Sequence, residues 1–285
     1  MIVRKNILPR TASDILSVGF ILTAIPLLYW FELWVVLPDL YEFGSLSYFF
    51  HFFLGNFIIL NIVGNFTYTV LCDTSTRDII VRSSEAETKN GWRLCSSCES
   101  LAPPRSWHCN TCNTCILKRD HHCIFTGCCV GHKNHRHFLM FLFYLFVGTA
   151  YAFFFNNFFI WGRIHFEFPM SILKIVFPLA IFVFGFDGSI EQFYLLLYIV
   201  TVIGMLFTGA LCAYHFHLVY IGCVANEKEK NKFIYDLGWK QNIVEVFGDR
   251  WYVAWLLPYI NSSLPHDGIA WDTPGSWQEN SNKTK

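Results

Sequence analysis

Hydrophobic residues gather in four long runs, separated by stretches that carry nearly all of the charged side chains. The runs cover Ile15 to Leu37, Leu46 to Cys72, Phe138 to about Trp161, and roughly Phe193 to Val224. About 20 apolar residues of helix cross the hydrocarbon core of a bilayer, so each run is long enough for one transmembrane helix. Backbone groups in lipid must be paired within the segment, which predicts that all four runs are α-helical.

A fifth apolar stretch, residues 172–186, is shorter and contains Lys174 and Pro178. A full crossing here would give five spans and place the two ends of the chain on opposite sides of the membrane. We expect instead that this stretch lies at the lumenal interface or re-enters the membrane from the lumenal side.

The distribution of Lys and Arg predicts the orientation of the spans. Three basic residues precede the first run, none lies in residues 38–45, nine lie in 73–137, two in 162–192, and seven after residue 224. Short loops rich in Lys and Arg stay in the cytosol. The predicted parts are a cytosolic N-terminus (1–14), helices one and two (15–72), a cytosolic cysteine-rich segment (73–137), helices three and four with a lumenal loop (138–224), and a cytosolic C-terminal region (225–285).

The composition supports a membrane protein and gives no case for a nucleic-acid partner. Hydrophobic residues make up 54% of the chain, charged residues only 15%, and the formal net charge is zero. An ordinary soluble domain carries more charge, and a nucleic-acid-binding domain carries an excess of basic residues.

The polar segment before the third run is rich in cysteine and histidine and has little apolar periodicity. Eight of the eleven cysteines lie between Cys95 and Cys129, in CxxC units interleaved with histidines. In a reducing cytosol this pattern favours tetrahedral Zn²⁺ over disulfides. Each zinc ion would contribute roughly 10–16 kcal/mol of apparent binding energy in place of a hydrophobic core.

The candidate ligands outnumber the eight that two tetrahedral zinc sites need. Three candidates must therefore stay uncoordinated, and the spacing alone leaves open which three they are. The candidates are Cys95, Cys98, His108, Cys109, Cys112, Cys115, His121, His122, Cys123, Cys128 and Cys129.

About 45 residues of this segment resemble the DHHC cysteine-rich domain of protein S-acyltransferases, the palmitoyltransferases. The matching positions are Cys95-x2-Cys98, Pro104-Arg105, His108-Cys109-x2-Cys112-x2-Cys115, Asp120-His121-His122-Cys123-x5-Cys129 and Asn134-x3-Phe138. The order of the spans and residues 235–248 also resemble that family. The resemblance implies an all-α integral membrane protein with four transmembrane helices and a cytosolic zinc-bound cysteine-rich domain between the second and third.

The resemblance also implies two structural zinc ions in interleaved Cys₃His sites. One site would use Cys95, Cys98, His108 and Cys115, and the other Cys109, Cys112, His122 and Cys129. Adjacent His108 and Cys109 can serve different metals because neighbouring side chains of an extended chain point to opposite sides.

Asp120, His121 and Cys123 then remain free of metal, with Cys128 as an additional cysteine. A cysteine, a histidine and a carboxylate are the components of an activated thiolate: His121 takes the thiol proton and Asp120 orients His121. The alternative is that all three only support the zinc ligands through hydrogen bonds. The resemblance implies that Cys123 accepts a long-chain acyl group from acyl-CoA and passes it to cytosolic cysteines of membrane-associated proteins.

Basic residues near the motif are candidates for the phosphates of CoA, since Arg and Lys both bind phosphate. Alternatively they offset the charge of the zinc thiolates or meet anionic lipid headgroups. They are Arg105, Lys118, Arg119, Lys133 and Arg136, with Arg105 favoured by its place in the motif.

The chain departs from the family pattern at several positions. Ile124, Phe125 and Cys128 replace a Pro, a Trp and an Asn. Residues 224–227 replace a Thr-Thr-x-Glu motif and keep only Glu227. We expect the lost threonine hydroxyls to weaken the link between the C-terminal region and the zinc segment.

Two other functions are open to a chain of this pattern. A membrane zinc scaffold would keep the metal sites without turnover. A channel or transporter would use the four spans, but Glu32 is their only charged residue, whereas ion pathways tend to contain buried charge. Gly148, Thr149 and Ala150 in the third run favour either a deep acyl groove or close helix packing. As a family-level expectation, the protein resides in the endoplasmic reticulum or the Golgi apparatus.

Overall fold

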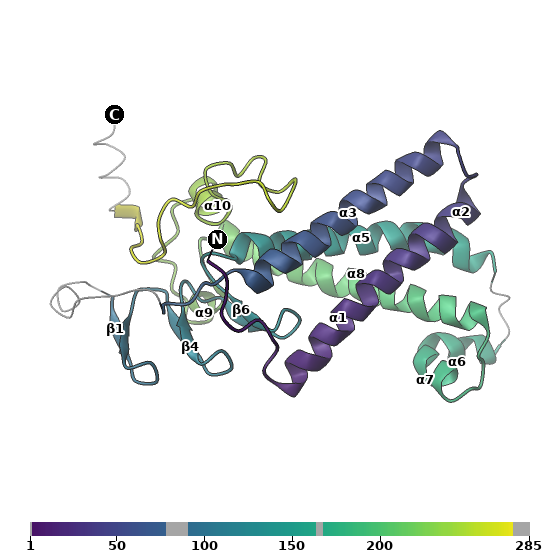
Figure 1. Cartoon of the computed structure of the whole chain (residues 1–285), viewed down its shortest axis with the longest axis horizontal. Coiled ribbons are helices and arrows are strands. Elements are labelled where there is room, and N and C mark those ends of the chain that lie inside the picture. Colours follow the sequence, from purple (N-terminus) through teal and green to yellow (C-terminus); the bar gives the residue numbers. More distant parts are fainter. Residues whose placement is uncertain (1, 78–90, 164–167, 276–285) are drawn as a thin grey trace. The chain divides into compact units, whose positions relative to one another are not determined.

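The computed structural model describes residues 2–77, 91–163 and 168–275 and is mostly helical (Figure 1). Four of the described helical segments are long and apolar enough to cross a membrane: Ala12–Leu40, Leu46–Leu71, His135–Trp161 and Ile190–Tyr220. The first consists of α1 (Ala12–Trp30), a π-helical turn η1 (Phe31–Val36) and α2 (Leu37–Leu40). The others are α3, α5 and α8, in that order. The prediction of four long apolar helices is confirmed.

Residues 172–186 form two short helices rather than one long one. These are α6 (Met170–Val176) and α7 (Pro178–Val183), of seven and six residues. Pro178 opens α7, where its missing N–H costs nothing. Neither helix can cross a bilayer, so the structure has no fifth span in this region. The lumenal interfacial position of the segment stays a prediction.

The cysteine-rich segment adds six short strands to the helical fold. They pair as three antiparallel hairpins: β1 (Arg93–Cys95) with β2 (Ser100–Ala102), β3 (Trp107–Cys109) with β4 (Thr114–Ile116), and β5 (His121–Cys123) with β6 (Cys128–Val130). Each strand has three residues. The expected all-α class is therefore correct for the spans but not for this segment.

Contacts between residues divide the chain into two compact units. The first contains residues 1–21, 63–141 and 213–285, and the second contains residues 22–62 and 142–212. In the first unit, the N-terminal segment runs beside the end of α3, where Val3 forms a bridge with Cys72 and the Arg4 amide donates to the Leu71 carbonyl. Residues 74–76 continue along β4, and the Leu117 amide donates to the Thr74 carbonyl.

Helices α9 (Ala225–Glu229) and α10 (Trp239–Phe247) follow α8 within the first unit. Gly222, with φ of +66°, turns the chain after the end of α8. The Asn242 side chain of α10 donates to the Tyr220 carbonyl at 2.9 Å and accepts from the Leu237 amide at 3.0 Å. Asn242, Val246 and Phe247 are buried. The C-terminal region is thus packed against the end of α8.

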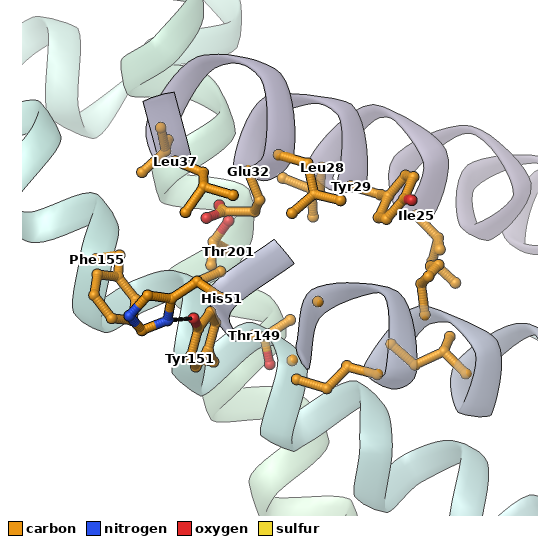
Figure 2. Close-up of a pocket in the computed structure, with 18 of the residues that line it drawn as sticks. Ile25, Leu28, Tyr29, Glu32, Leu37, His51, Thr149, Tyr151, Phe155 and Thr201 are labelled. Carbon is orange, nitrogen blue, oxygen red and sulfur yellow. Dashed lines mark hydrogen bonds between the residues drawn. The ribbon is translucent and has the colours of Figure 1, made fainter. Parts of the chain in front are cut away.

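The second unit contains an aromatic core and a cavity of about 110 Å³ (Figure 2). Aliphatic side chains such as Ile25, Leu28 and Leu37 form most of the cavity wall. Its polar lining includes Glu32, which accepts a hydrogen bond from Asn156 at 2.7 Å, and the hydrogen-bonded pair His51 and Tyr151. This wall suits an apolar ligand with few polar groups.

Gly148 lies where α5 packs against α3 in the second unit. A Cβ atom at this position would lie 3.1 Å from Ile58 Cγ2, so the glycine permits close approach of the two helices. Gly148 and Thr149 also line the cavity. The two alternatives for these small residues, close packing and an open groove, therefore coexist.

Gly131, directly after β6, is a sensitive position for the stability of the first unit. A Cβ atom there would lie 2.5 Å from the Leu117 carbonyl oxygen and 2.9 Å from Thr74 Oγ1. We expect Gly131→Ala to destabilise the protein by about 1–3 kcal/mol and to lower the Tm by several degrees, measured by tryptophan fluorescence. Gly188→Ala is the control, because no atom lies within 4 Å of its Cβ position. An unchanged Tm for Gly131→Ala would contradict the close contact.

Candidate active site

The three hairpins bring the cysteines and histidines into two sets of four. Cys95, Cys98, His108 and Cys115 form one set, and Cys109, Cys112, His122 and Cys129 form the other, with all potential ligand atoms of each set within 4.8 Å of one another. His108 and Cys109 are neighbours on β3 and belong to different sets, as the alternation of side chains along a strand requires. The two sets have the membership that the family resemblance implies.

The distances within the sets fit a zinc ion. In a tetrahedral Zn²⁺ site with ordinary bond lengths, two sulfurs lie about 3.8 Å apart, and a sulfur and a nitrogen about 3.6 Å apart. In the second set, the Cys112 and Cys129 sulfurs are 3.7 Å apart, and His122 Nδ1 lies 3.7, 3.4 and 3.7 Å from the sulfurs of Cys109, Cys112 and Cys129. In the first set, His108 Nδ1 lies 3.7 and 3.2 Å from the Cys95 and Cys98 sulfurs.

The two sets are copies of one arrangement, displaced along the chain by fourteen residues. Every member of the second set lies fourteen positions after its counterpart in the first. A third copy would begin at Cys123, and its other members would be Thr126, Arg136 and Phe143. None of these three side chains is a usual zinc ligand. Cys123 thus occupies the first ligand position of a metal site that the chain does not complete.

The backbone repeats with the same period, because each hairpin turn ends on a residue with positive φ. Glu99, Asn113 and Gly127 have φ of +50°, +48° and +58°. In the third turn the hydroxyl of Thr126 stands where the first two turns have the second cysteine of a CxxC unit. The third turn keeps the shape of the first two. Because Thr126 replaces the second cysteine of the CxxC unit, this turn supplies no second sulfur to share a metal with Cys123.

Side chains near the N-terminus support the second set. Asp14 Oδ1 lies 3.3 Å from His122 Nε2, so the carboxylate can fix the ring while Nδ1 faces the sulfurs. Arg10 donates to the Cys112 carbonyl at 2.6 Å. The sequence analysis missed Asp14. Its only local signal is the start of α1, where Thr11 Oγ1 accepts from the Asp14 amide.

Cys123, His121 and Asp120 form a connected group outside both sets. Asp120 Oδ2 accepts from His121 Nδ1 at 2.8 Å, and the side chains of His121 and Cys123 lie close enough to shift each other's pKa. Cys123 is 8% exposed and Asp120 3%. His215 of α8, which the sequence analysis did not single out, also contacts Asp120.

Charge within this group shifts the pKa of each member. Burial acts to raise the pKa of Asp120, but the hydrogen bond from His121 and the nearby imidazole of His215 outweigh it and hold that pKa well below its usual value. Burial acts to lower the pKa of His121, but Asp120 and Cys123 raise it to about 9. Burial acts to raise the pKa of the Cys123 thiol, and the interaction with His121 outweighs it, so that this pKa is lowered. The arrangement favours a thiolate beside an imidazolium.

The C-terminal region is tied to this group in spite of the missing threonines. The Ala225 amide donates to Asp120 Oδ1 at 2.7 Å. Glu227 forms a bidentate ion pair with Arg105, with contacts of 2.7 and 2.6 Å, and both side chains are almost fully buried. The expected loosening of this link is therefore not seen in the structure: a backbone donor and the retained glutamate hold it.

The five basic candidates for CoA contacts lie in different surroundings. Arg105 is buried, pairs with Glu227, and lies over the rings of Tyr235 and Trp271. Lys118 is 4% exposed and lies 5.1 Å from the centre of the Trp271 ring. Burial acts to lower the pKa of Arg119, but the nearby sulfurs of Cys129 and Cys109 outweigh it and raise that pKa. Arg136 donates to the Ile260 carbonyl at 3.1 Å. Lys133 is half-buried, and its ammonium forms no ion pair among the described residues.

Cys128 lies directly opposite Cys123 in the third hairpin. Its thiol donates to Thr126 Oγ1 at 3.4 Å and to the Thr69 carbonyl at 3.6 Å, and burial raises its pKa to about 11. Cys128 is therefore a buried hydrogen-bonded thiol and a poorer nucleophile than Cys123.

Four helices long and apolar enough to cross a membrane, with a Cys–His–Asp group beside two sets of potential metal ligands, are typical of a multi-pass membrane transferase. The family model of the DHHC palmitoyltransferases matches residues 88–232, about half of the chain, and the chain belongs to this family. It is 35% identical over 223 residues to the probable palmitoyltransferase ZDHHC24 of Danio rerio, covering 77% of this chain and 74% of that protein. It is 31% identical to the probable palmitoyltransferase ZDHHC24 of Mus musculus, covering 78% of both chains, and 34% identical to palmitoyltransferase ZDHHC22 of Danio rerio, covering 80% of both. The protein is a protein S-palmitoyltransferase.

The buried ammonium of Lys118 should make the stability of the protein depend on pH. Burial, with the charge of Arg105, lowers the pKa of Lys118 to about 7, whereas an unfolded lysine titrates near 10.4. Between these values the unfolded chain binds more protons, so the contribution of this group to stability rises with pH from about 7 to 10. We expect Lys118→Met to raise the Tm most at pH 7 and by less at pH 9.

The exposed Lys240 provides the matched control, because Lys240→Met removes a lysine that is in contact with solvent. Thermal unfolding of wild type and both variants across pH 7 to 9 measures the difference. Parallel pH profiles for wild type and Lys118→Met would contradict the assignment.

Proposed function

We propose that Cys123 is the residue that carries the acyl group during palmitoyl transfer, with His121 as its proton acceptor and Asp120 as the group that orients His121. The main support is the position of Cys123 in the repeat. It is the first residue of a third copy of the ligand arrangement, and the other three positions of that copy hold no usual zinc ligand. The Cys123 sulfur instead lies beside His121, whose Nδ1 donates to Asp120 Oδ2 at 2.8 Å.

The proposed reaction has two steps. In the first, the Cys123 proton passes to His121, and the thiolate attacks the thioester carbon of a long-chain acyl-CoA. The bond from that carbon to the CoA sulfur breaks, and CoA leaves as a thiol with the proton from His121. In the second, the thiol of a substrate cysteine gives its proton to His121 and attacks the acyl-Cys123 carbon. The bond to the Cys123 sulfur then breaks, and Cys123 regains a proton.

Two Zn²⁺ ions are proposed for the two Cys₃His sets. The chemistry of the donors supports zinc, since three thiolates and one imidazole with these spacings are an ordinary structural zinc site. The ions supply folding energy and take no part in acyl transfer. The proposal also includes the orientation and location of the protein. This segment and both ends of the chain lie in the cytosol, the five parts have the boundaries given above, and the protein resides in the endoplasmic reticulum or Golgi apparatus.

The acyl donor is proposed to be a long-chain acyl-CoA, with its chain buried in lipid or among apolar helices at about 0.8 kcal/mol per CH₂ group. Among the basic candidates for CoA phosphates, Lys133 has the best support because its ammonium is not engaged in an ion pair within the described residues. Arg105 pairs with Glu227, and Lys118 lies beside the Trp271 ring. Arg119 lies near the zinc-site thiols, and Arg136 donates to the Ile260 carbonyl. The acceptors are cytosolic cysteines of membrane-associated proteins.

Cys123→Ser should abolish acylation of the enzyme, because a serine hydroxyl is far less acidic than a thiol and does not form the anion here. The purified protein is incubated with radiolabelled palmitoyl-CoA, and hydroxylamine-labile label is counted. Cys128→Ser is the matched control and should keep most of the label, since it changes the opposite cysteine of the same hairpin. Equal labelling of wild type and Cys123→Ser would reject Cys123 as the acyl carrier. A folded wild type that never labels would instead favour a zinc scaffold without turnover.

Metal analysis of the purified wild type should return close to two zinc ions per chain. Cys112→Ser should lower this to about one and lower the Tm sharply, because Cys112 belongs to only one set. Cys128→Ser should keep both ions. A folded wild type with no metal, or a loss of both ions in Cys128→Ser, would contradict the assigned sets.

A further inference from the structure

The Asp120 carboxylate has a third neighbour that the proposed chemistry does not use. His215 lies on α8, and its Nδ1 is 3.3 Å from Asp120 Oδ2, the same oxygen that accepts from His121. The His215 side chain is 6% exposed and that of Asp120 is fully buried. Two imidazoles thus meet at one oxygen of a buried carboxylate.

The lone pairs of Asp120 leave room for a third donor. Oδ1 accepts from the Ala225 amide at 2.7 Å, and Oδ2 accepts from His121 at 2.8 Å. An ionised carboxylate offers about four acceptor positions, so Oδ2 can accept a second hydrogen bond. In the structure, His215 Nδ1 is close to Oδ2 but is not aligned well enough for a hydrogen bond and has no other partner. A buried nitrogen of this kind is costly unless it bonds during the working cycle.

Packing holds His215 in this position. The Phe138 ring lies edge-on to both imidazoles, with ring centres 5.1 Å from His121 and 5.1 Å from His215. The two imidazole rings are themselves 5.1 Å apart. Phe138 is 2% exposed, so water has little access from its side.

We propose that His215 is a positioning residue for acyl transfer, which donates to Asp120 Oδ2 and keeps the carboxylate aligned with His121. This inference rests on the proposed roles of Cys123, His121 and Asp120. When His121 accepts the proton of Cys123, its new positive charge must face a carboxylate that does not turn away. The Ala225 amide holds one oxygen, and His215 restrains the other.

The test uses substitutions that keep or remove the donor at Nδ1. The side-chain amide of His215→Asn places an N–H near the position of Nδ1, that of His215→Gln places it near Nε2, and His215→Leu has no donor. The measured quantities are the single-turnover rate of enzyme acylation at saturating palmitoyl-CoA, the KM for palmitoyl-CoA, the zinc content and the Tm of the full-length protein. His217→Leu is the control, because His217 lies on the same helix and is exposed.

We expect His215→Leu to slow acylation by about tenfold or more, the loss typical when a hydrogen-bond partner that orients a metal-ligating histidine is removed, with the KM and zinc content unchanged. His215→Asn should recover most of the rate, His215→Gln should not, and His217→Leu should match wild type. In an Asp120→Ala background, His215→Leu should cause no further loss, since His215 acts through that carboxylate.

Several outcomes would overturn the role of His215. One is an acylation rate of His215→Leu equal to that of wild type, and another is equal rates for His215→Asn and His215→Gln. The third is that His215→Leu slows acylation by the same factor in the Asp120→Ala variant as in wild type. If His215→Leu does not fold, the comparison of the Asn and Gln variants still decides. Absence of label on wild type would overturn the proposed function as a whole, which is a different result from equal labelling of wild type and His215→Leu.

Discussion

Strands of three residues carry too few hydrogen bonds and too little apolar area to fold unaided, and residues 93–130 consist of three such hairpins. The buried cluster at their centre is made of Cys109, Cys112, Cys129 and Ile116, so the side chains that form the core of the segment are mostly potential metal ligands. The whole site depends on this constraint. Whatever holds the two sets of four together also fixes the hairpin on which Cys123 lies. His122 and Cys129 of the second set are paired across this hairpin, directly next to the pair of Cys123 and Cys128.

The same arrangement separates structure from chemistry within a few residues. On β5, His122 faces the second set, whereas His121 and Cys123 lie on either side of it and point to the opposite face. That face meets the end of α8 and the start of α9, which bring His215 and the Ala225 amide to Asp120. The group of Asp120, His121 and Cys123 is thus assembled from a hairpin that carries potential metal ligands on one side and a helical segment on the other.

The sequence was sufficient to predict the four long helices, because the length of an apolar run is a local property. It did not predict the hairpins, although the family resemblance supplied the correct grouping of the ligands. Once the two sets are known, the fourteen-residue displacement between them is visible in the sequence and marks Cys123 as the uncompleted position. Asp14 and His215 could not be predicted, since each meets its partner across about a hundred residues and only the packing of the helices brings them there. The ion pair of Arg105 with Glu227 could not be predicted for the same reason, since the two residues are far apart in the sequence.

The hydrogen bond from the Ala225 amide to Asp120 comes from the main chain, so it does not depend on which side chain residue 225 carries. A threonine hydroxyl is lost with one substitution, but the amide of residue 225 is present whichever amino acid stands there. The link therefore keeps its donor with every replacement at this position except proline, which has no N–H. A site that looks degenerate by its side chains can keep its geometry intact through the backbone.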